Sequence, residues 1–128
     1  MGIVDDDAAT VATWAELARA SGYAVRGYRD PRRALHELSR ERVDVVLLDL
    51  DMPYVSGVTL ARALCSAWAG AHPGLVLISG RVARLPASDL AVFDEALCKP
   101  VDFEVVLLAV GRAIARGEER VRSTPSSC

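Results

Sequence analysis

Short apolar runs alternate along the chain with longer segments in which apolar residues recur at helical spacing. Four runs are dominated by aliphatic residues, and they cover residues 2–4 (GIV), 45–48 (VVLL), 75–79 (LVLIS) and 95–98 (EALC). Residues 23–28 (YAVRGY) form a fifth, weaker strand candidate. Continuous apolar strands are typical of a parallel sheet that is covered on both faces. The pattern therefore predicts a doubly wound α/β sandwich built from five βα units.

The segments between these runs carry the signals of helices. The first predicted helix has apolar residues at i, i+3, i+4 and i+7, which are Val11, Trp14, Ala15 and Ala18. A second helix begins at Asp30, because a capping side chain followed by Pro31 is a typical helix start. A third covers residues 57–68, and the last begins at Asp102.

Two regions depart from this regularity. Pro86 lies within the segment RVARLPASDLAVF, and proline disrupts a helix interior, so we expect the fourth helix to be short, displaced or irregular. After residue 117 the chain becomes polar and loses its helical period, ending in TPSSC. We therefore predict one domain over residues 1–117 and a flexible C-terminal tail over residues 118–128.

Length and charge narrow the classes of function. The chain has 128 residues, a size typical of a single domain. Its 15 Lys and Arg residues are balanced by 17 Asp and Glu residues, so charge gives no reason to expect direct nucleic acid binding. The sequence contains neither an apolar stretch of about 18 residues nor a basic, apolar leader. We expect no membrane association and a cytoplasmic location.

The cysteines and histidines suggest no metal or catalytic site. Cys65, Cys98 and Cys128 lack CxxC spacing and have no histidine cluster near them. We expect Cys65 and Cys98 to be buried and reduced. His36 and His72 have no neighbouring residues in the sequence that would make either a general base.

Polar side chains gather instead where the predicted strands end. The carboxyl ends of the strands in an open α/β sheet form the usual ligand site. The residues that follow these strands are Asp5, Asp6, Asp7, Asp49, Asp51, Ser79 and Lys99. Crowded carboxylates repel one another unless a hard divalent cation neutralises them, and oxygen-only ligands suit Mg²⁺. Asp7 alone has an equally good explanation as a helix cap.

Four motifs at these strand ends resemble those of a known family. VDDD, LLDLDMPYVSG, LISG and CKP occur in this order, and together they are similar to the receiver domain of bacterial two-component response regulators over about residues 2–116. The resemblance implies a flavodoxin-like fold with strand order 2-1-3-4-5. It also implies phosphoryl transfer from the phosphohistidine of a histidine kinase or phosphotransfer protein to an aspartate. Such a protein is a phosphoacceptor with slow autodephosphorylation rather than a multi-turnover enzyme.

The resemblance assigns roles to four of these acids. Asp49 would be the phosphoacceptor, and Asp5 and Asp6 would be the acid pair that binds Mg²⁺, for which Mn²⁺ can substitute. Asp49 itself and the main-chain carbonyl of Asp51 would complete the protein ligands. Chemistry supports this set, because a carboxylate is a weak nucleophile and needs cations to neutralise the transferring group.

Further residues would act around the acceptor. By resemblance, Ser79 would bind a phosphoryl oxygen on activation, and Lys99 would pair first with Asp49 and then with the phosphoryl group. Gly80 leaves room for a donor beside Ser79. By resemblance also, Pro100 would follow a cis peptide bond, while Pro53 and Gly57 would shape the loop next to the acceptor.

Output is expected to differ from the family pattern. Receivers commonly carry an aromatic residue three positions before the lysine, and its ring turns inward on activation. Here that position is Ala96, which has no ring. We therefore expect the signal to leave through the last helix, where Val101, Val105 and Leu108 add apolar surface beyond the core face, and where a homodimer could form.

Two charged residues are expected to flank the mouth of the site. Asp51 lies two positions after the acceptor, and Arg81 lies two positions after Ser79. An ion pair between them would hinder the approach of water and lengthen the life of the phosphoryl group. The alternative is two solvated loop charges, which contribute little.

Parts of the sequence also fit two other functions. The DLD sequence also resembles haloacid-dehalogenase-type phosphatases, but those place further metal-binding acids after the lysine, whereas an amphipathic helix follows Lys99 here. A degenerate receiver that only binds partners is the second alternative. The sequence leaves open whether the chain is a stand-alone receiver, a relay shuttle, or part of a hybrid histidine kinase or longer regulator.

Overall fold

Five parallel strands form the centre of the protein in the computed structural model, which describes residues 1–123. They are β1 (Gly2–Val4), β2 (Arg26–Tyr28), β3 (Val45–Leu48), β4 (Gly74–Ser79) and β5 (Glu95–Cys98). Their order in the sheet is β2-β1-β3-β4-β5, and every neighbouring pair is parallel. The predicted doubly wound flavodoxin-like fold is thereby confirmed.

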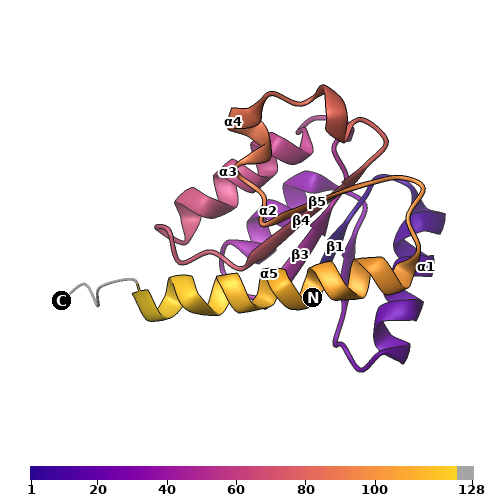
Figure 1. Cartoon of the computed structure of the whole chain (residues 1–128), viewed down its shortest axis with the longest axis horizontal. Helices are drawn as coiled ribbons and strands as arrows, with labels where there is room; N and C mark the ends of the chain where they lie inside the picture. The colour runs from indigo at the N-terminus through magenta and orange to yellow at the C-terminus, as the bar shows by residue number, and fades with distance from the viewer. Residues whose placement is uncertain (124–128) are drawn as a thin grey trace.

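Helices cover both faces of this sheet (Figure 1). They are α1 (Ala8–Ala20), α2 (Pro31–Leu38), α3 (Gly57–Ala67), the short 3₁₀ turn η1 (Val82–Arg84), α4 (Ala87–Leu90) and α5 (Phe103–Ser123). One core lies between the sheet and α2 and α3, and it includes Leu38, Leu60 and Leu64. The other lies between the sheet and α1 and α5, and it includes Ala18 and Val110. Successive strand residues alternate between the two cores, which is why the strands read as continuous apolar runs.

Capping side chains start three helices next to the carboxyl edge of the sheet. Asp7 accepts a hydrogen bond from the Ala9 N–H at the start of α1, and Asp30 accepts one from Arg32 N–H at the start of α2. Ser56 does the same for Thr59 at the start of α3. Each cap satisfies an N–H group that the helix itself leaves unpaired. The caps therefore fix the loops that carry the polar residues.

The fourth helix is as short as the sequence predicted. Pro86 directly precedes α4, which has only four residues. The edge strand β5 follows this short helix, and its Ala96 and Cys98 side chains are exposed. The expectation that Cys98 is buried was therefore wrong, whereas Cys65 is half-buried.

The last helix continues beyond the predicted end of the domain. It ends at Ser123, so residues 118–123 are helical, although the sequence placed them in a flexible tail. Arg120 explains the extension, because its guanidinium donates to both carboxylate oxygens of Asp94 at 2.7 Å and to the Pro73 carbonyl at 3.1 Å. The rest of the predicted tail, residues 124–128, lies outside the described residues. Within residues 1–123, none of the helices combines the length and the apolar character needed to cross a membrane.

Candidate functional site

Three carboxylates meet where β1 and β3 end. Asp5 follows β1 and donates its N–H to the Tyr28 carbonyl at 3.1 Å, and Asp49 follows β3 and donates its N–H to Val4 O at 3.0 Å. Extended sheet pairing therefore fixes the backbone of both residues. One carboxylate oxygen from each of Asp5, Asp6 and Asp49 lies within 4.8 Å of the other two. Asp5 is buried, Asp49 is half-buried and Asp6 is exposed, so the cluster opens to solvent on one side.

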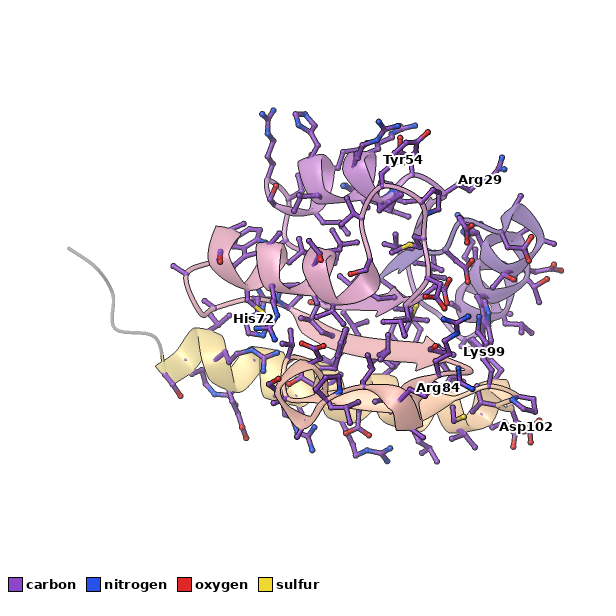
Figure 2. All side chains as sticks on the ribbon, turned by 90° about the horizontal axis from the view of Figure 1, so that it is seen from above. Arg29, Tyr54, His72, Arg84, Lys99 and Asp102 are labelled. Carbon is purple, nitrogen blue, oxygen red and sulfur yellow. The ribbon has the colours of Figure 1, made fainter. Side chains whose placement is uncertain are left out.

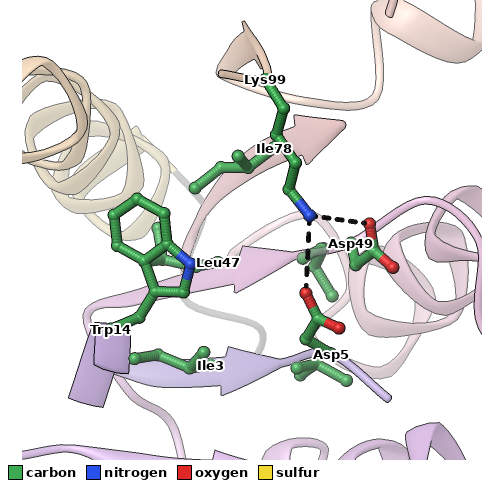
Figure 3. Close-up of a pocket in the computed structure, with 9 residues that line it drawn as sticks. Ile3, Asp5, Trp14, Leu47, Asp49, Ile78 and Lys99 are labelled. Carbon is green, nitrogen blue, oxygen red and sulfur yellow. Dashed lines mark ion pairs between the residues drawn. The ribbon is translucent and has the colours of Figure 1, made fainter. Parts of the chain in front are cut away.

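Lys99 brings a cation to this cluster. Its Nζ lies 3.7 Å from Asp5 Oδ2 and 3.7 Å from Asp49 Oδ1 (Figure 3). The Lys99 N–H donates to Ser79 O at 3.0 Å, which continues the pairing of β5 with β4 and places the side chain at the same edge. The peptide bond between Lys99 and Pro100 is cis. One lysine thus bridges two of the three acids.

A single lysine does not balance the buried negative charge. Burial is the main reason that the pKa of Asp5 is raised. The Asp7 N–H hydrogen bond and Lys99 lower this pKa, whereas the charges of Asp6 and Asp7 raise it. Burial likewise raises the pKa of Asp49, and the charge of Asp5 raises it further. Burial and mutual repulsion therefore disfavour the ionised carboxylates, and a nearby cation offsets both effects. The oxygen-only donors of the cluster match the ligands that a hard divalent cation such as Mg²⁺ prefers.

Asp7 has the structural role that the sequence left open. Its carboxylate accepts hydrogen bonds from Ala9 N–H at 3.3 Å and from the Thr10 hydroxyl at 2.6 Å. The bond from Thr10 is the main reason that the pKa of Asp7 is lowered. Asp7 N–H in turn donates to Asp5 Oδ1 at 2.9 Å. Asp7 therefore caps α1 and orients Asp5.

Gly57 and Pro53 shape the loop after β3. Gly57 N–H donates to Leu50 O at 2.8 Å, and the Pro53 carbonyl accepts from Val55 N–H at 2.9 Å. A Cβ atom on Gly57 would lie 2.2 Å from the main-chain oxygen of Asp49. Glycine is thus the only residue that permits this close approach of α3 to the Asp49 backbone.

The other side of the mouth is formed by the loop after β4. Ser79 is buried, and its hydroxyl oxygen accepts a hydrogen bond from Arg81 N–H at 3.0 Å. Arg81 Nε lies 3.4 Å from Asp51 Oδ2, so the two charges expected to flank the mouth face one another. Both side chains are about three-fifths exposed, at 60% and 62%. A Cβ atom on Gly80 would meet no atom within 4 Å, which leaves that side of Ser79 open.

Sequence reasoning missed one aromatic residue of the site. Trp14 was assigned to the core face of its helix, yet it also lines the small cavity beneath Asp5, Asp49 and Lys99 (Figure 3). Its ring packs against Phe103, with ring centroids 5.3 Å apart. Trp14 further lines an open cleft of about 470 Å³ with Thr10, Lys99, Pro100 and Val101. Helical periodicity predicted that Trp14 faces inward but carried no signal that α1 and the loop after β5 enclose a cleft.

A second missed residue is Tyr54, in the loop after β3. Its φ angle is 72°, and 76% of its surface is exposed. The guanidinium carbon of Arg32 lies 3.8 Å from the centre of its ring. Nothing in the apolar pattern distinguishes this tyrosine. The pattern does not report backbone angles, and the partner Arg32 lies in a different element, α2.

Comparisons with known proteins agree with this geometry. The family model of the response regulator receiver domain matches residues 1–110. Response regulator MprA of Mycolicibacterium vanbaalenii is 37% identical over 128 residues, covering 96% of this chain and 51% of MprA. Response regulator PleD of Caulobacter vibrioides is 33% identical over 117 residues, covering 89% of this chain and 25% of PleD. The chain therefore spans about half the length of MprA and a quarter of PleD.

Solved structures show the same fold. A response regulator receiver domain protein from Clostridium thermocellum superposes with a TM-score of 0.81 at 20% identity, covering 92% of this chain and 95% of that one. A CheY-like receiver domain protein from Methanospirillum hungatei gives a TM-score of 0.79 at 20% identity, with coverages of 92% and 94%. The strand order and the helix layers are thus shared across distant sequences.

Proposed function

The chain belongs to the response regulator receiver family, and from this premise we propose that it accepts a phosphoryl group on Asp49 from the phosphohistidine of a histidine kinase or phosphotransfer protein. The observation that carries the proposal is the meeting of Asp49 with a cation and two further acids at one strand edge. Lys99 Nζ lies 3.7 Å from the Asp49 carboxylate, and Asp5 and Asp6 complete the cluster. Membership of this family argues against the haloacid-dehalogenase-type phosphatase.

In the proposed transfer, a carboxylate oxygen of Asp49 forms a bond to phosphorus while the bond from phosphorus to the donor imidazole nitrogen breaks. Asp49 is held for this by its backbone pairing to Val4 and by the close approach of Gly57. Fixing the nucleophile is the main contribution that a protein can make to phosphoryl transfer, together with charge neutralisation. Lys99 supplies one positive charge at the acceptor.

A divalent cation would supply the remaining positive charge. We propose that Asp5, Asp6 and Asp49 hold Mg²⁺ through their carboxylates and that the main-chain carbonyl of Asp51 is a further ligand, with Mn²⁺ as a substitute. When bound, the ion neutralises charge on the transferring group. The raised pKa values of Asp5 and Asp49 support this, because burial and then neighbouring carboxylates disfavour their ionised forms, and a bound cation would offset that cost.

After the transfer, Lys99 and Ser79 are placed to interact with the new phosphoryl oxygens. Lys99 would keep its position between Asp5 and Asp49, and the Ser79 hydroxyl would turn from its bond with Arg81 N–H toward the phosphoryl group. The product is a phosphorylated protein rather than a released molecule. This matches a family whose members are generally not multi-turnover enzymes.

Labelling by acetyl phosphate tests the acceptor. The parent protein should gain one phosphoryl mass by intact-mass spectrometry in the presence of Mg²⁺, and Asp49→Asn should gain none. Asp102→Asn is the matched control, because Asp102 is an exposed aspartate at the same end of the sheet (Figure 2). Undiminished label on Asp49→Asn would disprove the assignment. A parent that takes no label in any Mg²⁺ concentration would favour a degenerate receiver instead.

The metal ligands are tested separately. Asp6→Ala should weaken Mg²⁺ binding while Asp49 remains in place, because a carboxylate ligand is removed. Trp14 lines the cavity next to Asp5 and Asp49, so its fluorescence offers a direct readout of the titration. An unchanged Mg²⁺ titration of Asp6→Ala would contradict the role of the acid pair.

We also propose that the Asp51–Arg81 pair slows loss of the phosphoryl group. The two side chains meet at 3.4 Å beside the acceptor, where they would hinder the approach of water to Asp49. Arg81→Ala should therefore shorten the lifetime of the phosphorylated protein. Asp51→Asn should shorten it to the same extent, and the double variant should show no further loss. Because both side chains are exposed, their pair has little intrinsic strength, and an unchanged lifetime would show that it is an incidental surface contact.

For output we propose a contact surface on α5, including a homodimer. Val105 and Leu108 are 43% and 66% exposed on this helix, and Val101 before it is half-buried. Ala96, where an aromatic switch is expected, is exposed and has no ring to turn. Val105→Glu with Leu108→Lys should leave labelling intact and abolish self-association, measured by light scattering with and without a phosphoryl mimic. Val121→Glu is the control, because Val121 is 48% exposed near the far end of α5.

Two expectations about location and partners remain predictions. The cytoplasmic location rests on the sequence alone. The absence of direct nucleic acid binding rests on the net charge of −2, and it concerns this chain only, which covers 42% of the transcriptional regulatory protein PrrA of Mycobacterium tuberculosis.

A further inference from the structure

Acids occupy the centre of the carboxyl edge, but arginines lie on both sides of it. Arg29 directly follows β2, and Arg84 ends η1 after β4. Because β1 and β3 lie between β2 and β4 in the sheet, these two arginines flank the acid cluster from opposite sides. Figure 2 shows the same arrangement, with Arg29 on one side of Lys99 and Arg84 on the other.

These two arginines differ from most others in the protein. Ion pairs hold six other exposed arginines: Arg26, Arg32, Arg33, Arg62, Arg112 and Arg116. Within residues 1–123, the exposed side chains of Arg29 and Arg84 form neither a hydrogen bond nor an ion pair. Their charges are therefore available to a partner that approaches Asp49.

An exposed aromatic anchor stands on the same rim as Arg29. Tyr54 has a φ of 72°, in the left-handed region that costs a bulky side chain free energy. Its ring is not buried in return, because 76% of the residue is exposed. Arg32 holds the ring from one side at 3.8 Å, and Asp30 fixes Arg32 through a 3.2 Å ion pair. Tyrosine and arginine are the residue types enriched among the residues that dominate binding at protein interfaces.

We propose that Arg29, Tyr54 and Arg84 form a docking rim for the protein that carries the phosphohistidine, and that this donor presents acidic side chains around its phosphohistidine. The inference rests on the proposed function of Asp49 and adds the chemistry of the partner. Acids on the donor would pair with Arg29 and Arg84 and would orient the phosphohistidine toward the centre of the rim. The chain as a whole has a net charge of −2, so attraction of an acidic partner has to come from such a local surface.

Matched phosphodonors test the proposal. Two synthetic helical peptides, each with one phosphohistidine flanked either by glutamates or by glutamines, serve as probes. The parent should accept phosphate about tenfold faster from the glutamate peptide at low salt, and the preference should fade as ionic strength rises. Arg29→Glu with Arg84→Glu should remove or reverse the preference. Arg40→Glu is the control, because Arg40 is exposed just after the C-terminal end of α2, away from the acid cluster, and should keep it.

Tyr54→Gly separates docking from folding. Glycine adopts the positive φ without strain, so the variant should unfold no more easily than the parent. Transfer from both peptides should nevertheless slow, because the aromatic anchor is lost. Acetyl phosphate labelling, measured in parallel, reports whether the acceptor itself works, so its failure would refute the proposed function rather than the rim.

Three results would overturn the docking rim. They are equal rates from the two peptides with the parent protein, a preference that survives the double charge reversal, and transfer to Tyr54→Gly at the parental rate. Competition by duplex DNA that the charge reversal abolishes, without any peptide preference, would assign the arginines to a nucleic acid instead.

Discussion

Buried charge is treated differently at the two ends of the sheet. At the carboxyl edge, Lys99 Nζ approaches Asp5 and Asp49 only to 3.7 Å, and both acids have raised pKa values because of burial. Before the amino end of β5, both oxygens of the nearly buried Asp94 carboxylate accept hydrogen bonds from Arg120 at 2.7 Å. Asp94 also accepts one from Leu75 N–H at 2.9 Å.

The difference separates a site for chemistry from a site for stability. A carboxylate that is satisfied by a bidentate arginine has little left to offer to a metal or a phosphoryl group. The acids at the carboxyl edge keep their oxygens available, and the folded protein carries their repulsion as a cost. At the amino end, Arg42 adds a second clasp by donating to the carbonyls of Ala71, His72 and Gly117.

The largest effect is expected from breaking the satisfied pair. Arg120→Ala leaves the Asp94 carboxylate buried with one N–H partner, releases the Pro73 carbonyl and leaves the His72 carbonyl with Arg42 alone. We expect a loss of about 3 kcal/mol in the free energy of unfolding, measured by urea denaturation. Arg33→Ala is the control, because its pair with Glu37 is largely exposed on the arginine side and should cost less than about 1 kcal/mol. Equal losses in the two variants would refute the distinction.

The opposite sign is expected at the acid cluster. Asp49→Asn removes a carboxylate whose pKa is raised, so the variant should be more stable than the parent by roughly 0.5–2 kcal/mol at pH 7 in EDTA. The cost of ionised Asp49 appears only as pH rises above the ordinary value of 3.8, so the difference should vanish at lower pH. Thermal unfolding across this pH range measures it. A less stable Asp49→Asn protein would show that Lys99 already compensates the acids.

The smallest effect concerns His72, which lies between the two clasps. Burial lowers its pKa, the charge of Arg120 lowers it further, and Arg42 adds to this against Asp94. The folded state therefore favours neutral His72, and its contribution to stability is present above the unfolded value of 6.5 and is lost as pH falls below it. We expect a loss on the order of 1 kcal/mol or less between pH 7.5 and 5.5, and a smaller loss in His72→Gln. His36→Gln, at an exposed position on α2, should behave as the parent does.

The sequence predicted the elements that short-range patterns determine. Apolar runs located four of the five strands, the weaker candidate at residues 23–28 contained β2, and Pro86 predicted the short α4. Spacing after the strands also brought together Asp5, Asp6, Asp49 and Lys99, because parallel strands end at one edge. The register of the strands could not be predicted in this way, because it depends on how different strands align and not on any single residue.

Most of what the sequence missed depends on contacts between residues that are distant in sequence. The C-terminal end of α5 looked like a tail because its helical period is lost, yet Arg120 reaches Asp94, which lies 26 residues earlier. We expected Cys98 to be buried because free cysteines usually are. It is exposed, because β5 is an edge strand and the neighbouring α4 has only four residues. Tyr54 is exposed at a positive φ angle and packs against Arg32 of α2. Local patterns carry no information on such partners.

The two glycines at the acceptor differ in how much variation they permit. Gly57 faces the Asp49 carbonyl so closely that its Cβ would overlap the oxygen at 2.2 Å, whereas a Cβ on Gly80 would meet nothing within 4 Å. In a saturation library, position 57 should therefore tolerate no replacement, even alanine, while position 80 should accept small side chains. Natural sequence variation is therefore expected at position 80, after β4, and not at position 57, where the acceptor backbone excludes any side chain.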